Sequence, residues 1–234
     1  MAMTKTSVVF FYVTPKGFIF RFMLSIHQYK KSYSGRTILQ IDSLQLSPGI
    51  YWLRAENGAG KTTLFRSIAG LIPFEGNIEA NGIRLRQQRK AYTTIVSFAE
   101  AEPVYPGFLS GSELLQFYLQ TKGGDAKKMQ YLAKCLMVES YLPCQVATYS
   151  SGMLKKLSLL LAFTGKPVWI LLDEPFITLD TEAVEALQVV ITQQHHSGVS
   201  FLISSHQELA LKTPYHSLQI RQQTIHQQPY VAGA

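Results

Sequence analysis

The sequence predicts an α/β protein with a mainly parallel sheet, an antiparallel β part near the N-terminus and an inserted helical part. Short apolar runs alternate with stretches of helical periodicity, which is typical of parallel strands joined by helical crossovers. The run 168–172 is apolar without interruption, as expected for a strand buried on both faces. Between residues 104 and 149 the periodicity is helical, so this block is predicted to be a separate helical lobe.

Composition narrows the classes of protein. The 234 residues suffice for one domain with a sizeable core, and 47% hydrophobic against 16% charged residues excludes a disordered chain. A net charge of +7 suits nucleic acid or an anionic membrane. The basic residues are scattered or gathered in short loops such as 84–90, however, and no nucleic-acid-binding motif occurs, so no nucleic-acid partner is expected. Two cysteines form neither a disulfide framework nor a zinc site and favour a reducing compartment. No run approaches the roughly 20 apolar residues of a membrane span.

The N-terminal third is predicted to contain strands and one helix. Residues 1–22 differ in pattern from the rest of the chain and are expected to lie outside the fold, as an extension or a mis-called start. Leu24, Ile26 and Gln28 alternate as in a strand. Further strands are expected at 38–41 and 50–53, a helix at 64–69 ended by Gly70, a hairpin with an Asn-Gly turn at 74–82, and a strand at 95–98.

The remaining elements are predicted from caps and apolar runs. Ser110 and Glu113 form a capping box at the start of one helix of the lobe, and Asp125 caps a second. A leucine-rich helix is expected at 154–163, then the strand 168–172, a helix from Thr181 to Gln194 capped by Asp180, and a last core strand at 199–203. We expect one domain at 23–222, with its helical part at about 104–150, and a C-terminal tail at 223–234.

The stretch Ala55–Thr63 has the pattern of a phosphate-binding loop between a strand and a helix. Its glycines let backbone N–H groups turn towards a phosphate, and the helix N-terminus adds positive charge. Lys61 can then reach the β- and γ-phosphates, and the Thr62 hydroxyl can hold Mg²⁺. The first glycine of the motif is replaced by Ala55, which is tolerable if this position needs no positive φ. The alternative is a glycine-rich turn that binds nothing. The sequence therefore predicts a P-loop NTPase core.

Polar groups come directly after the apolar strands of the predicted sheet. Asp173 can bind Mg²⁺, and the adjacent Glu174 can orient or deprotonate a water that attacks the γ-phosphate. His206 comes after the last core strand and can contact the same phosphate or water. Tyr33 lies upstream of Lys61, where its ring either stacks on a base or packs on the sheet rim. A histidine after a strand is more often structural, but these groups occur together with Lys61.

The motifs resemble, in order, those of the nucleotide-binding subunit of ATP-binding-cassette (ABC) transporters over about 23–222. Residues 55–63 are similar to Walker A and 168–174 to Walker B with its catalytic glutamate. Residues 150–153 resemble the signature motif, with Tyr149 and Ser151 where leucine and glycine are usual. The nucleotide-binding positions that the resemblance implies are Tyr33, Asn57, Gly58, Ala59, Gly60, Lys61, Thr62, Thr63, Ser150, Ser151, Gly152 and, in the D-loop, Asp180.

The resemblance implies an ATPase that uses ATP and Mg²⁺. Its catalytic residues would be Glu174, His206 and Lys61, and its metal would be held by Thr62, Asp173 and Glu100, with Glu100 at a position where the family often has glutamine. Two cassettes, identical or paralogous, would enclose two ATP molecules. The chain would bind a membrane-spanning permease at the cytoplasmic face of the membrane, and its short form is similar to that of exporter cassettes.

Other interpretations remain. The main alternative is a soluble ABC-type ATPase that is not coupled to transport. Such proteins resemble tandem cassettes or carry coiled-coil insertions, and this sequence shows neither feature. An ATP-binding scaffold without hydrolysis and a small-molecule kinase explain fewer of the motifs. The segment 103–108, with Val104, Tyr105, Pro106 and Phe108, is predicted to be an apolar loop that docks the permease. The alternative is that these side chains only pack the lobe onto the core.

Overall fold

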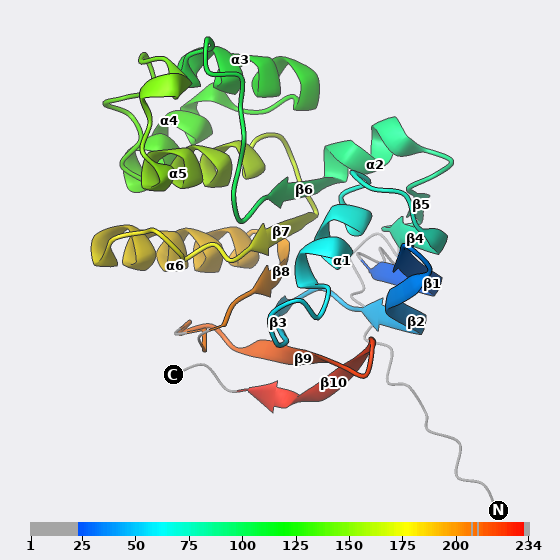
Figure 1. The fold of residues 1–234 in the computed structure, drawn as a ribbon. Helices are drawn as coiled ribbons and strands as arrows, with labels where there is room; N and C mark the ends of the chain where they lie inside the picture. Colours follow the sequence, from blue (N-terminus) through cyan, green and yellow to red (C-terminus); the bar gives the residue numbers. More distant parts are fainter. Residues whose placement is uncertain (1–22, 207, 210, 232–234) are drawn as a thin grey trace, which may run out of the picture.

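The computed structural model describes residues 23–206, 208–209 and 211–231, which form two sheets and a set of helices around them (Figure 1). The strands are β1 Leu24–Tyr33, β2 Arg36–Leu46, β3 Ile50–Arg54, β4 Glu75–Ala80, β5 Ile83–Arg84, β6 Val96–Ala99, β7 Trp169–Asp173, β8 Ser200–Ser204, β9 Tyr215–Arg221 and β10 Thr224–Val231. The helices are α1 Lys61–Ile68, α2 Arg89–Ile95, α3 Gly111–Lys122, α4 Ala126–Cys135, the 3₁₀ turn η1 Val146–Thr148, α5 Ser151–Ala162 and α6 Thr181–His196.

The larger sheet has six strands in the order β10-β9-β3-β8-β7-β6. The pairs β9–β3, β3–β8, β8–β7 and β7–β6 are parallel, and β10 pairs antiparallel with β9. Every residue of β7 and β8 is buried, because helices or other elements cover both faces of these central strands. The predicted α/β fold with a mainly parallel sheet is confirmed.

The smaller sheet is antiparallel and has the order β2-β1-β4-β5. Its β4–β5 hairpin turns at Asn81 and Gly82, whose φ angles are 52° and 77°, as a two-residue turn with two left-handed positions requires. Strand β1 bulges at Gln28, where the pairing with β4 changes register. Gly76 lies opposite this bulge, and a Cβ there would lie 2.2 Å from the carbonyl oxygen of Gln28, so only glycine fits.

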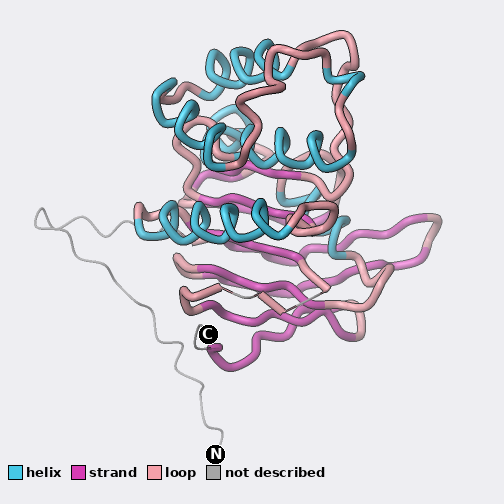
Figure 2. The backbone as a smooth tube through the Cα atoms, turned by 90° about the vertical axis from the view of Figure 1, so that its left-hand side faces the viewer, coloured by secondary structure: helices cyan, strands magenta, loops and turns pink. Residues whose placement is uncertain are grey.

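Helices α3, α4 and α5 form a lobe that lies above α6 and the larger sheet in the tube view (Figure 2). The predicted caps are present, since the side chains of Ser110, Asp125 and Asp180 each accept a backbone N–H at the start of a helix. Ser150, which was not predicted as a cap, does the same at the start of α5. The apolar face of α4, including Met129 and Leu132, is buried in the same cluster as the central strands. The lobe is therefore packed onto the sheet through a continuous core.

The expectation of a C-terminal tail at 223–234 is wrong for 224–231, which form β10 at the edge of the larger sheet. The strand has no apolar run, and its turn consists of Gln222 and Gln223 with φ angles of 48° and 62°, residues that give no turn signal in the sequence. Helix α2 was not predicted either. The proposed extension 1–22 lies outside the described residues. None of the helices in the described part of the chain is long and apolar enough to span a bilayer.

Candidate functional site

The loop between β3 and α1 has the form that the sequence predicts. Gly58 and Gly60 have φ angles of 75° and 99°, and Gly60 is the N-cap of α1, so both glycines use conformations that other residues rarely adopt. Ala55 is absent from the described residues with positive φ, which removes the steric objection to alanine at the first position of the loop. The loop thus leads into the N-terminus of α1, whose backbone N–H groups are suited to binding an anion.

Lys61 is buried to 7% exposure at the start of α1. Its ammonium donates to the carbonyl oxygen of Ala55 at 2.8 Å and to that of Glu56 at 3.4 Å, and it lies 3.5 Å from Nε2 of His206. Burial lowers the pKa of Lys61, and the nearby carboxylates of Glu174 and Asp173 offset part of this shift. The side chain is therefore held inside the loop, beside the groups at the strand ends.

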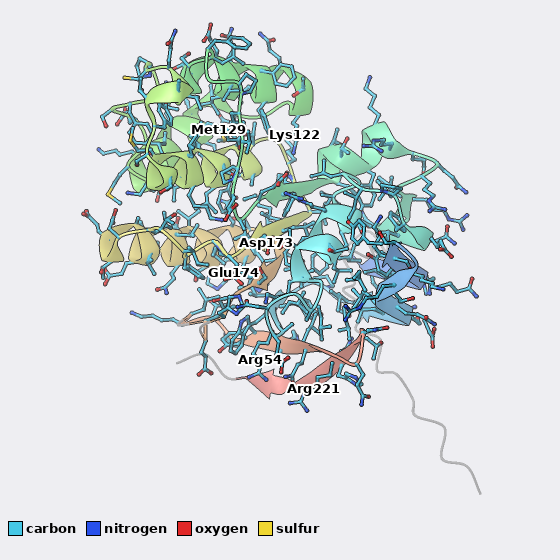
Figure 3. All side chains as sticks on the ribbon, viewed as in Figure 1. Arg54, Lys122, Met129, Asp173, Glu174 and Arg221 are labelled. Carbon is cyan, nitrogen blue, oxygen red and sulfur yellow. The ribbon has the colours of Figure 1, made fainter. Side chains whose placement is uncertain are left out.

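Asp173 and Glu174 occupy the end of β7, near the centre of the molecule (Figure 3). Asp173 is fully buried, and its Oδ1 accepts the hydroxyl of Ser204 at 2.5 Å. The same hydroxyl oxygen accepts the backbone N–H of Glu174 at 2.9 Å. Ser204, the last residue of β8, thereby fixes the turn at the end of β7. Glu174 takes a left-handed backbone conformation with φ 46°, which is costly for a non-glycine residue and occurs preferentially at functional sites.

His206 completes this group from the end of β8. Its Nε2 lies 3.3 Å from Oε1 of Glu174, and its backbone N–H donates to Oε2 of the same carboxylate at 3.4 Å. The imidazole side chain is 44% exposed, whereas the Glu174 side chain is 11% exposed. Lys61, Glu174 and His206 are therefore neighbours, as the order of strands in a parallel sheet implies.

The site has the donors that a magnesium ion takes in phosphoryl-transfer proteins. Among the described residues, the buried Oδ2 of Asp173 has no hydrogen-bond partner. Thr62, the next residue after Lys61, is exposed. No cluster of three or more His, Cys, Asp or Glu side chains suited to a metal occurs in the described part of the chain. A hard cation held by one carboxylate, one hydroxyl and phosphate oxygens fits this donor set.

A cavity of about 650 Å³ adjoins the outer side of the loop. It lies between the start of β2, the loop residues Glu56, Gly58 and Ala59, and the β9–β10 turn. Tyr33, at the end of β1, is 48% exposed, and the ammonium of Lys31 lies 4.5 Å from its ring centroid. Asn57 is exposed and Thr63 half-buried. The cavity is large enough for a nucleoside, but Tyr33 is not among the residues that line it.

The signature-like residues lie apart from Lys61, at the start of α5 on the lobe. Ser150 and Ser151 are exposed, and Oγ of Ser150 accepts the N–H of Met153 at 3.2 Å. Gly152 faces the segment after β7, where an added Cβ would lie 2.9 Å from the carbonyl oxygen of Thr178. Asp180 caps α6 and accepts from Lys156 at 3.0 Å.

Glu100 comes directly after β6, and its carboxylate pairs with Arg66 at 2.8 Å. It lines a second cavity of about 500 Å³ together with Val104, Tyr105 and side chains of α3. Val104 is 90% exposed and Phe108 is 76% exposed, as a docking loop requires. Tyr105, in contrast, packs against the apolar cluster of the lobe, and burial raises its pKa, so this side chain agrees with the alternative of internal packing.

Three residues of the site were missed from the sequence. Ser204 and Arg66 were not assigned roles, and serine or arginine at such positions gives no specific signal. Lys155 is different, because it lies on the apolar face of a leucine-rich helix, three and four residues before the buried Ser158 and Leu159. A charged residue at that spacing is a detectable sign of a buried cation with dedicated partners.

Comparison with known proteins gives one consistent result. Residues 39–177 match the family described as ABC transporter. The chain is 32% identical over 190 residues to the ABC-type transporter ATP-binding protein EcsA of Bacillus subtilis (strain 168), covering 79% of this chain and 77% of the relative. It is 29% identical over 186 residues to the lantibiotic transport ATP-binding protein SrtF of Streptococcus pyogenes, covering 79% and 80%.

Solved structures share the fold. An ATP-binding subunit of an ABC transporter superposes with a TM-score of 0.77 at 24% identity, covering 87% of this chain and 88% of the other. A bacterial Atm1-family ABC exporter with ATP bound gives a TM-score of 0.73 at 15% identity, and this chain covers 38% of its length. Both likenesses show the P-loop NTPase fold that the sequence predicts.

Proposed function

The chain belongs to the ABC transporter family as an ATP-binding subunit, and we propose that it hydrolyses ATP with Mg²⁺ to power a separate membrane-spanning subunit, as an exporter. One observation carries the proposal. At one end of the sheet, Nε2 of His206 lies 3.5 Å from the ammonium of Lys61 and 3.3 Å from Oε1 of Glu174. The cysteine content and the family together favour the cytoplasmic face of the membrane as the location.

The arrangement supports a phosphoryl transfer in which the protein mainly positions groups and neutralises charge. Lys61 would leave its loop carbonyls and bind the β- and γ-phosphates. Thr62 and Asp173 would hold Mg²⁺, which supplies charge neutralisation at the phosphate oxygens. Glu100, the third residue expected to hold the metal, would first have to leave its ion pair with Arg66. Glu174 would orient a water and accept its proton, and His206 would contact the γ-phosphate or that water. Tyr33 would stack on the base beside the cavity that adjoins the loop.

A second cassette would complete the site. Ser150 and Ser151 are exposed at the N-terminus of α5, and the Ser150 hydroxyl accepts an N–H of its own helix. A γ-phosphate from a facing copy, or from a paralogue, would be stabilised by this helix N-terminus. The names of two relatives, lantibiotic transport SrtF and linearmycin resistance LnrL, support export, whereas TupC of Peptoclostridium acidaminophilum, 29% identical over 192 residues, belongs to a tungstate uptake system.

Phosphate release by the purified chain with Mg-ATP tests the enzymatic part. We expect turnover by the wild type, none by Lys61→Ala and wild-type turnover by Lys134→Ala. Lys134 is an exposed lysine on α4 and serves as the matched control. The wild type should be tested alone and together with any paralogous ABC cassette encoded beside it. If it binds ATP in both cases without releasing phosphate, an ATP-binding scaffold is the better interpretation.

The exposed side chains of Val104 and Phe108 allow a test of membrane coupling. Changing both to Asp is expected to remove the chain from the membrane fraction of its native cells, while ATP binding and melting temperature stay unchanged. Val189→Asp on α6 is the matched control, because Val189 is an apolar side chain with 53% exposure outside the second cavity. Equal membrane association of the double variant and the wild type would mean that this loop is not the docking site. A wild type that is absent from the membrane fraction would favour the soluble-ATPase alternative.

A further inference from the structure

Lys155 is buried to 1% exposure in the second turn of α5. Its ammonium donates three hydrogen bonds, to the carbonyl oxygens of Glu100 at 2.8 Å, Ala101 at 3.1 Å and Asp173 at 2.8 Å. An ammonium has three donors and no acceptor, so every donor of this side chain is satisfied. Burying a charge without such partners would be strongly unfavourable, which makes the arrangement a specific one.

The three carbonyl groups belong to parts of the molecule with different roles. Asp173 ends β7 and carries the carboxylate assigned to Mg²⁺. Glu100 and Ala101 come directly after β6, the parallel neighbour of β7, and Glu100 lines the cavity beside the exposed docking loop. Lys155 itself lies in the N-terminal part of α5, shortly after Ser150. This is the end of the helix that we propose binds the nucleotide held by a second copy of the chain. The ammonium of Lys155, on α5, therefore contacts both the end of β7, which carries the proposed Mg²⁺ ligand Asp173, and the segment after β6 that borders the second cavity. We call this second cavity the docking cavity.

We propose that Lys155 is a positioning residue that fixes the main chain at Asp173, and through it the Mg²⁺-binding carboxylate, relative to α5 and to the docking cavity. The inference rests on the proposed function, since it assigns the role of Asp173 within it. Lys155 does not touch the nucleotide. It acts on catalysis through the strand end that it holds.

Comparison with the neighbouring Lys156 shows that the location of Lys155 on α5, and not merely the presence of a positive charge on this helix, is what matters for the proposed role. Lys156, whose side chain is 13% exposed, pairs with the 62% exposed side chain of Asp180, and a pair with one solvent-exposed partner contributes little. Arginine at position 155 keeps the charge, but its planar fork cannot direct three N–H groups from one atom at three carbonyls. Methionine keeps much of the length and leaves all three carbonyl oxygens without their donor.

The test compares Lys155→Met, Lys155→Arg and the exposed control Lys134→Met with the wild type. For the methionine variant we expect kcat to fall by about tenfold to a hundredfold, because displacing a catalytic group by about 1 Å costs up to about 10²-fold. ATP affinity without metal should stay within about threefold, because Lys61 and its loop are untouched. The Mg²⁺ concentration for half-maximal ATP binding should rise severalfold. The arginine variant should recover part of both losses.

Two results would overturn the proposal. One is a folded methionine variant with wild-type kcat and wild-type Mg²⁺ dependence. The other is a parallel loss of metal-free ATP affinity and melting temperature that accounts for the whole loss of turnover, as expected of a purely structural lysine. If the methionine variant does not fold, wild-type kcat and Mg²⁺ dependence in the arginine variant overturn it. Failure of the proposed function is distinguishable, since the wild type itself would then show no turnover.

Discussion

Two regions of the chain are assigned to ATP, the strand ends of the larger sheet and the start of α5, and they differ in how many of their side chains contact one another within this chain. At the end of the larger sheet, His206 lies beside both Lys61 and Glu174, and Ser204 holds the carboxylate of Asp173 and the backbone N–H of Glu174. At the start of α5, Ser150 and Ser151 are exposed and the Ser150 hydroxyl caps its own helix. The first region is a site that one chain assembles. The second is a surface whose proposed role requires a second copy, so changes in the two regions should fail in different ways.

The largest effect is expected from Lys61→Ala. The change should weaken ATP binding by about tenfold to a hundredfold, because hydrogen bonds to charged groups contribute roughly 1.5–3 kcal/mol each. Equilibrium binding of a fluorescent ATP analogue measures it. Equal affinity of this variant and the wild type would mean that the phosphates do not lie at the loop.

Glu174→Gln should separate binding from turnover. The amide keeps the size of the side chain but is a far weaker base, so kcat is expected to fall by about 10²-fold or more while ATP affinity is retained. Single-turnover phosphate release with radiolabelled ATP is the measurement. Near-normal turnover would remove Glu174 from the chemistry and leave its left-handed backbone conformation without a functional explanation.

Two serines provide a matched comparison between structure and function at helix starts. Ser110 caps α3 and Ser150 caps α5, each by accepting an N–H three residues on at 3.2 Å. Alanine at either position should lower stability by about 1 kcal/mol. Only Ser150→Ala should also slow ATP hydrolysis. Thermal melts and phosphate release on both variants measure this, and an equal effect of the two on turnover would count against a role for Ser150 beyond capping.

The smallest effect concerns Lys122, which lies outside both regions. Burial lowers its pKa from 10.5 to about 8, and its ammonium donates to Ser97. Between about pH 8 and 10.5 the unfolded state therefore binds more protons than the folded state, and the contribution of Lys122 to stability rises with pH. Tyr105, Tyr118 and Glu100 line the same cavity, and the pKa values of both tyrosines are raised, so neither tyrosine loses its proton in the lower part of this window.

Urea melts of the wild type and Lys122→Met between pH 7.5 and 10 test this assignment. The difference in unfolding free energy, wild type minus variant, should increase with pH, and ATP affinity should be unaffected by the substitution. A difference that is flat or decreases with pH would show that the ammonium is not buried at this position.

The sequence predicted those parts of the molecule whose physics is local. The loop 55–63, the caps at Ser110 and Asp180 and the buried strand β7 can be derived from spacing, side-chain oxygens and apolar runs, and the structure contains them. Strand β10 could not be predicted, because an edge strand with polar residues gains its stability from pairing with β9 rather than from its own pattern. The role of Ser204 depends on partners distant in sequence, which no local pattern specifies. The position of Lys155 on an apolar helix face indicates a buried cation, but its three partners are likewise distant in sequence and could not be named.

The most direct test of the central claim, that one chain supplies Lys61, Glu174 and His206 and a second copy supplies Ser150, is the ATPase activity of a mixture. Lys61→Ala and Ser150→Glu should each be inactive alone. The glutamate should leave folding intact, because an acidic residue is favourable at a helix N-terminus, but it repels a phosphate there. Mixed in equal amounts, they should regain about a quarter of the wild-type rate, because half of the dimers of a closed pair would hold one intact site of two. A mixture as inactive as its components, or full activity of Ser150→Glu alone, would contradict the claim.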